Sequence, residues 1–231
     1  MNKTAERLCA YSGVVFSALL GVGLLGVTTL WQPPAPGLGA GQIARLFQQN
    51  TLQIRLGVAV LAAGSAFYWP FAAAITTQMR RIEGKAHSLA ETQMATATGT
   101  VIAVLLACFL WFAAAYRPGV MPPAIVQSLN DLGWLCFVGL YPPAVLQCVV
   151  IGVCILSQQP ETMIYPRWLG FVNFWAAIIF LPGAAVPFFQ SGPFAWNGLV
   201  SFWLVAGVFF GWIILMSFAT AAAIKRMNFE G

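Results

Sequence analysis

The segment 165–190, YPRWLGFVNFWAAIIFLPGAAVPFFQ, decides the fold class. Its apolar part is about 20 residues long, which is the length that an α-helix needs to cross a bilayer. The segment also contains Asn173, the only asparagine deep in an apolar run, and prolines at positions 182 and 187. In hydrocarbon, an amide side chain needs a hydrogen-bond partner, and a proline leaves a backbone carbonyl without its usual donor. We therefore expect this helix at the centre of a bundle.

The composition of the whole chain agrees with a membrane protein. Of its 231 residues, 60% are hydrophobic and 7% are charged, which is too few charges to cover a soluble globule. We predict an all-α fold, a single domain over residues 1–231, built as a polytopic integral membrane bundle of six transmembrane helices. The first apolar run is longer than the core of a signal peptide, so we expect it to be a retained span. The six predicted spans are about 11–31, 54–78, 93–116, 132–157, 168–189 and 198–224.

The positions of the basic residues predict the orientation. Eight basic residues flank the span ends assigned to one side, and three lie on the other side. By the positive-inside rule, both the N and C termini are cytoplasmic, which agrees with an even number of spans. We expect a multi-pass protein of the cell membrane, the bacterial inner membrane, whose partners include membrane lipids but no nucleic acid. The first group is Lys3, Arg7, Arg80, Arg81, Lys85, Arg167, Lys225 and Arg226; the second is Arg45, Arg55 and Arg117.

The outer loop 32–53 has two parts. It opens with QPPAPGLGAG, whose prolines and glycines end a helix. Its second part carries Ile43, Leu46 and Phe47 at helical spacing among polar residues. This pattern is open to two interpretations, a short amphipathic helix on the outer surface or a connecting loop with apolar anchors.

Prolines inside the apolar runs predict kinks in three spans. Pro70 lies in the second span, Pro142 and Pro143 in the fourth, and Pro182 in the fifth. A proline inside a helix removes a hydrogen bond and bends or breaks the helix. Backbone freed at this depth usually faces protein or a cavity. We therefore expect a cleft near the middle of the membrane, between spans two, four and five.

Small residues recur every four positions in three spans. Such spacing lets two helix backbones approach closely, which is a main mode of helix association in lipid. We favour packing within the chain over a contact between copies in a homo-oligomer. The residues are Gly13, Ser17 and Gly21 in the first span, Ala95, Gly99, Ala103 and Ala107 in the third, and Gly207 and Gly211 in the sixth.

Spans two and five share a short pattern. Arg55 and Pro70 in the second span match Arg167 and Pro182 in the fifth, with Leu-Gly and Ala-Ala pairs at similar places. Because the two spans run in opposite directions, a duplication of three helices would be an inverted repeat, as in many transporters. The match covers only a handful of letters and stays a hypothesis.

Candidate binding residues lie near the outer helix ends and inside the spans. One interpretation is an interfacial belt in which Asp131 neutralises Arg55 or Arg117. The other is a ligand site in which an arginine orients the polar end of a substrate and aromatic residues hold its apolar body. The candidates are Arg55, Arg117, Asp131, Tyr141, Gln147, Asn173 and Trp175.

Asn173 itself has an expected structural role. We predict that its side chain hydrogen-bonds to another helix, either to Gln147 or to a carbonyl freed by Pro142 or Pro143.

The sequence offers little material for catalysis. The single histidine, His87, lies in a loop without a second histidine or a cysteine at ligand spacing, so no metal site and no catalytic residue are predicted. The five cysteines lie mostly in apolar runs and indicate buried thiols rather than disulfides. No cofactor is predicted, but the aromatic residues either fill the bundle or line a pocket for a lipid, quinone, carotenoid-like molecule or sterol. Those of the last two spans are Phe171, Phe174, Trp175, Phe202, Trp203, Phe209, Phe210 and Trp212.

Three functions remain, in this order. The first is a non-enzymatic accessory or scaffold subunit that packs against another integral membrane protein or a hydrophobic small molecule. The second is a small transporter for a neutral or weakly anionic hydrophobic compound, which would have a central cavity between spans two, four and five. The third is a membrane enzyme, which would need a cofactor or metal that the chain's own residues do not suggest.

Overall fold

A computed structural model describes residues 3–26, 33–85, 87–139, 141–160 and 163–226. Within these residues every regular element is helical. Six segments are long and apolar enough to cross a membrane, as predicted, and they are numbered here as spans one to six. The predicted end of the first span, 27–31, lies outside the described residues. The spans are Lys3–Leu24, Thr51–Glu83, Ser88–Tyr116, Pro123–Leu156, Arg167–Phe188 and Leu199–Arg226.

The described residues form nine α-helices and three helices of other types, and all of them except α2 lie at least partly within the spans. The α-helices are α1 (Lys3–Gly21), α2 (Ala40–Gln49), α3 (Thr51–Ser65), α4 (Tyr68–Glu83), α5 (Ser88–Tyr116), α6 (Pro123–Gly139), α7 (Pro142–Leu156), α8 (Arg167–Phe180) and α9 (Val205–Arg226). The others are the π-helices η1 (Val22–Gly26) and η5 (Leu199–Leu204) and the 3₁₀-helix η4 (Leu181–Phe188).

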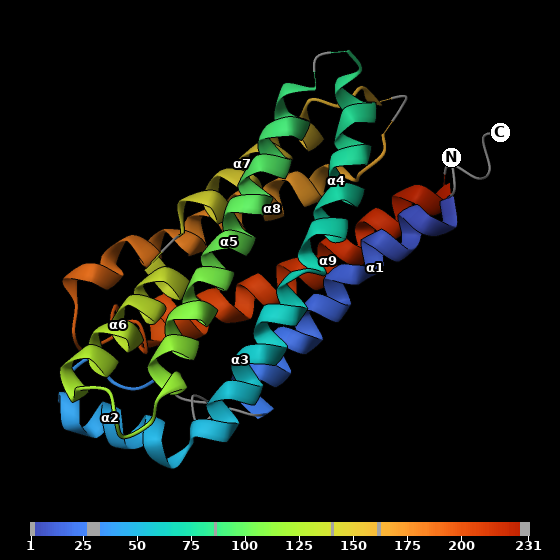
Figure 1. Ribbon diagram of the computed structural model, residues 1–231. Coiled ribbons are helices and arrows are strands. Elements are labelled where there is room, and N and C mark those ends of the chain that lie inside the picture. Colours follow the sequence, from blue (N-terminus) through green and yellow to red (C-terminus); the bar gives the residue numbers. More distant parts are fainter. Residues whose placement is uncertain (1–2, 27–32, 86, 140, 161–162, 227–231) are drawn as a thin grey trace.

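The bundle has two chemically different ends (Figure 1). At one end lie the start of α1, the end of α9 and the connections from α4 to α5 and from α7 to α8. This is called the basic end, because it carries the eight basic residues of the first group above. The opposite end carries α2, the start of α3 and the connection from α5 to α6.

The helix α2 lies across the opposite end (Figure 1). Its residues Ile43, Ala44 and Phe47 are buried, and the helix packs mainly on α6. The second part of the outer loop therefore forms an amphipathic helix rather than an irregular connection. Its apolar face covers this end of the bundle, while its polar residues face outward.

Spans two, four and five all change direction or helix type at the predicted prolines. Span two is interrupted between α3 and α4, and Pro70 is the third residue of α4. In span four, Pro142 and Pro143 are the first two residues of α7. In span five, the α-helix gives way to the 3₁₀-helix η4, whose second residue is Pro182. A proline is tolerated in a first turn because the backbone N–H that it lacks would have no partner inside the helix.

Most of the small residues of spans one and three pack within the chain, but Ala95 is exposed, and a Cβ added to Gly21 would meet no described atom within 4 Å. A Cβ added to Gly13 would meet Ser217 and Phe71, and one added to Gly99 would lie 3.3 Å from Pro143. Gly207 and Gly211, by contrast, are exposed, and no described atom lies within 4 Å of a Cβ built there. The expectation of packing within the chain is therefore wrong for span six.

The packing gives the inverted repeat no support. In such a repeat, spans one, two and three correspond to spans four, five and six. If span two contacts spans four and six, span five should therefore contact spans one and three. In the structure α4 contacts α7 and α9. The described residues of α8 and η4 make no comparable contact with α1 or α5.

Candidate ligand pocket

A cavity of about 110 Å³ lies between spans one, three, four, five and six. It sits near the middle of spans three and four. Span two contributes no residue to this lining, so this cavity is a different one from the cavity expected between spans two, four and five. The lining residues are Leu20, Leu24, Thr100, Ala103, Val104, Phe137, Val138, Tyr141, Ala144, Phe180, Ser201, Phe202, Val205, Ala206, Phe209 and Phe210.

Four departures from α-helical backbone meet at this cavity. The lining includes Leu24 from η1, Tyr141 at the start of α7, Phe180 at the junction of α8 with η4, and Ser201 from η5. Irregular backbone at membrane depth is tolerated where it is buried in protein or lines a cavity. The π-helical segments also fit this position, because π-bulges are frequent at functional sites. Four of the irregular backbone segments that the structure describes therefore contribute to the same cavity.

The cavity lies in the gap between two walls. One wall is α9 with η5, which packs on α1 and less extensively on α8 and α4. The other is formed by α5 together with α6 and α7, each of which packs closely on α5. Within the described residues, α9 makes no extensive contact with α5, α6 or α7. On both walls some lining residues, such as Tyr141 and Ala206, are only partly buried, so the cavity is not sealed from the side of the bundle.

The lining is almost entirely apolar. Among its described residues only Thr100, Tyr141 and Ser201 have polar side chains, and none is charged. The hydroxyl of Ser201 donates to the backbone oxygen of either Pro182 or Phe194, each 3.1 Å away. The hydroxyl of Thr100 donates to the backbone oxygen of the residue four positions earlier, at 3.2 Å. The cavity thus suits an uncharged, mainly apolar molecule.

The charged candidates lie away from this cavity. Arg55 donates through Nε and Nη2 to the carbonyl oxygen of Ala115, at 3.1 and 2.8 Å, and through Nη2 to that of Tyr116 at 2.8 Å. These are the last carbonyls of α5, where a cation also interacts favourably with the helix dipole. Arg117 lies 5.8 Å from the ring centre of Tyr116.

Asp131 has a different neighbour from the one expected. Its carboxylate accepts a hydrogen bond of 3.0 Å from the Asn130 side chain. In the part of the chain that the structure describes, it forms no ion pair with Arg55 or Arg117. The two arginines and Asp131 are therefore not joined into one charged site.

Asn173 forms the cross-helix bond that was predicted, but with another partner. Its Oδ1 accepts from the indole Nε1 of Trp212 on α9 at 2.9 Å. Its Nδ2 donates to the backbone oxygen of Leu169 at 2.8 Å and lies 3.7 Å from the sulfur of Met216. All four side chains are buried. Asn173 thus fixes α8 against α9 rather than lining the cavity.

Gln147 and Trp175 are also outside the lining. Gln147 accepts a hydrogen bond of 2.9 Å from the Tyr68 hydroxyl, which fixes α7 against α4. Its Nε2 is buried without a partner among the described residues. Trp175 is 64% exposed on the outer face of α8. Of the seven candidate residues, the structure brings only Tyr141 into the cavity.

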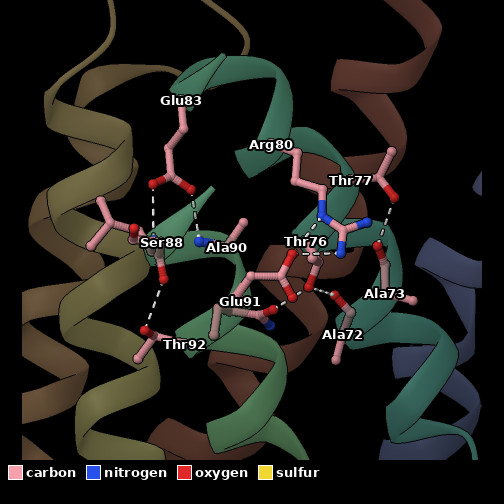
Figure 2. Close-up of polar contacts among 12 residues, drawn as sticks. Ala72, Ala73, Thr76, Thr77, Arg80, Glu83, Ser88, Ala90, Glu91 and Thr92 are labelled. Atoms are coloured by element: carbon pink, nitrogen blue, oxygen red, sulfur yellow. Dashed lines mark hydrogen bonds and ion pairs between the residues drawn. The ribbon is translucent and has the colours of Figure 1, made fainter. Parts of the chain in front are cut away.

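A second polar cluster, at the basic end, has structural contacts rather than an open site (Figure 2). The Glu83 carboxylate accepts from the backbone N–H groups of Leu89 and Ala90, at 2.9 and 2.7 Å, and so caps the start of α5. Arg80 forms an ion pair of 2.6 Å with Glu91, whose side chain is 58% exposed. These contacts join α4 to α5.

Sequence reasoning identified part of the lining and missed the rest. Phe202, Phe209 and Phe210 were among the aromatic residues expected to line a pocket or fill the bundle. Thr100 and Ser201 were missed, although each is a polar residue within an apolar span. That signal is weak, because threonine and serine in membrane helices commonly bond to their own backbone.

The described residues contain no group of three or more histidine, cysteine, aspartate or glutamate side chains that could hold a metal ion. Comparisons of the chain with protein-family models, with curated proteins and with solved structures gave no match.

Proposed function

We propose that this protein is a non-enzymatic membrane protein that holds a hydrophobic small molecule in the cavity between α9 and the α5–α7 wall, as an accessory or carrier subunit. The observation that carries the proposal is the meeting of four irregular backbone segments at one apolar cavity. Holding backbone out of α-helical form inside a membrane is costly, so its concentration at one cavity supports a role in binding.

The chemistry of the lining supports an uncharged occupant. No described lining residue is charged, and most of the surface comes from aliphatic and phenylalanine side chains. The gap between the two walls would admit such a molecule from the bilayer. A lipid, quinone, carotenoid-like molecule or sterol has this character.

The test is native mass spectrometry of the protein extracted gently from its own membrane, with two matched variants. Ala206→Phe places a ring in the cavity, whereas Ala222→Phe adds the same ring to an exposed position of the same helix. We expect the wild type and Ala222→Phe to carry a reproducible small-molecule mass that Ala206→Phe lacks. Equal occupancy in all three proteins, or none in the wild type, would refute the proposal. The same spectra report a second copy of the chain or another membrane protein.

A transporter is the second candidate function. The helix breaks in spans two, four and five favour it, because such breaks allow parts of a bundle to move relative to one another. It predicts that the protein in liposomes accelerates the passage of a hydrophobic compound across the bilayer. An accessory or carrier subunit would bind the compound without accelerating its passage.

We also propose that both termini are cytoplasmic, in the inner membrane of a bacterium. The eight basic residues of the basic end support this orientation by the positive-inside rule. Single cysteines placed at Lys85 and Arg117, in a variant without the native cysteines, test it. A membrane-impermeant maleimide applied to intact spheroplasts should label position 117 and spare position 85. The reverse pattern would invert the topology.

A further inference from the structure

The three polar side chains of the cavity differ in whether their hydroxyl proton is free to be donated to a ligand. The hydroxyl protons of Thr100 and Ser201 are already donated to backbone oxygens. The hydroxyl of Tyr141 forms no hydrogen bond with the part of the chain that the structure describes, and it is not among the polar atoms that protein encloses. Tyr141 is therefore the side chain in the described lining with a hydrogen-bond donor to spare.

The position of Tyr141 is set by the break in span four. It is the residue directly before α7, and it is followed by Pro142 and Pro143, which have no backbone N–H. The backbone N–H of Val145 is bonded to the Tyr141 carbonyl at 3.1 Å. The Tyr141 ring also packs near Gly183 in η4, where an added Cβ would lie 2.8 Å from the tyrosine Cβ. The ring is thus held between spans four and five, at the edge of the cavity.

A free phenol donor at this depth has few alternatives. Leaving a hydroxyl without a hydrogen-bond partner in an apolar medium is unfavourable. The start of a helix carries positive partial charge, which also favours an electronegative atom nearby. Both effects favour an acceptor oxygen on the bound molecule, and the absence of charge in the described lining favours a neutral one.

The size of the cavity limits what enters it. An engineered apolar cavity of about 150 Å³ takes up benzene. This cavity, of about 110 Å³, is smaller, so it encloses at most one ring or a short branched group, and the rest of a larger molecule would extend through the gap between the walls into the bilayer.

From these observations, and resting on the proposed function, the geometry points to a defined ligand class: a neutral, mainly apolar molecule whose ring or head group carries a carbonyl or ether oxygen that accepts a hydrogen bond from Tyr141. Isoprenoid ketones and quinones belong to this class, and pure hydrocarbons such as carotenes do not.

The test compares two probes of the same shape, acetophenone and α-methylstyrene, in which C=CH₂ replaces C=O. Their dissociation constants are measured by saturation-transfer NMR with the protein in lipid nanodiscs, and empty nanodiscs are subtracted. A single neutral hydrogen bond changes affinity by roughly threefold to tenfold. We expect the wild type to bind acetophenone more tightly than α-methylstyrene by this factor.

Three variants separate the possible explanations. Tyr141→Phe keeps the ring and removes the hydroxyl, so it should lose the preference for acetophenone and keep its affinity for α-methylstyrene. The retained affinity also shows that the variant is folded. Tyr116→Phe should keep the preference, because it removes the same hydroxyl from an exposed tyrosine outside the cavity. Ala206→Phe should lose both probes.

The outcomes distinguish this inference from the function on which it rests. A wild type without a preference, or a preference that persists in Tyr141→Phe, overturns the role of Tyr141 while the cavity remains a binding site. Binding of both probes that is unchanged by Ala206→Phe shows that they bind elsewhere, and it overturns the inference together with the proposed pocket.

Discussion

The hydrogen bond between Asn173 and Trp212 should couple spans five and six measurably. The distance between Asn173 Oδ1 and Trp212 Nε1 is 2.9 Å, and both side chains are buried. In membrane proteins such bonds contribute about 0.6 kcal/mol on average and about 1.7 kcal/mol at most. Asn173→Leu also leaves the indole N–H without a partner, which adds to the loss. We expect Asn173→Leu to lower the free energy of unfolding by about 1–2 kcal/mol.

A double-mutant cycle isolates the bond itself. Trp212→Phe removes the donor and keeps an aromatic ring, and the double variant removes both partners. Each protein is unfolded by titration with SDS in mixed micelles, and the coupling energy is calculated from the four free energies. We expect a coupling of about 1 kcal/mol, since the donor and acceptor belong to the same bond. Additive effects, with a coupling within about 0.3 kcal/mol of zero, would refute the reasoning.

Two further predictions use matched pairs of variants and the same unfolding assay. Gly13→Ala should destabilise the protein by about 1–3 kcal/mol, because the added methyl group would overlap Ser217. Gly21→Ala should change stability by less than about 0.5 kcal/mol, because no described atom lies within 4 Å of the added methyl group. Equal effects of the two variants would contradict the close packing of α1 on α9. Glu83→Ala should lower the free energy of unfolding by about 1 kcal/mol, because it removes the cap of α5. Glu91→Ala should change the free energy of unfolding little, because its ion pair with Arg80 is exposed. A larger loss for Glu91→Ala would show that the ion pair contributes more to stability than the cap.

The sequence predicted the architecture through features that act locally. The six apolar runs set the number of spans, because length and hydropathy alone decide whether a helix can cross hydrocarbon. Pro70, Pro142 and Pro182 located the interruptions for a similar reason, since the effect of a proline is confined to its own turn. For α2 the spacing left a helix and a connecting loop open; the structure has the helix, and it buries Ile43 and Phe47 of the three apolar residues that the spacing indicated.

What the sequence did not predict depends on how helices are arranged in space. The partner of Asn173 is Trp212, which lies on a different span from the expected Gln147. Gly207 and Gly211 share the spacing of Gly13 and Ser17, yet they face outward, because α9 presents its other side to the bundle. Spacing within one helix shows which residues share a face, but not which face meets a neighbour.

The two outward glycines of α9, Gly207 and Gly211, should affect how fast a ligand enters and leaves the cavity. Each glycine lowers helix stability by about 1 kcal/mol relative to alanine, and here no packing contact within the described chain compensates for that loss. They lie next to Ala206 and Phe210, which line the cavity. We therefore expect this turn of α9 to bend more easily than the turns of α9 that lack glycine. Stiffening it with Gly207→Ala should slow both entry and departure of a ligand while leaving its equilibrium affinity nearly unchanged.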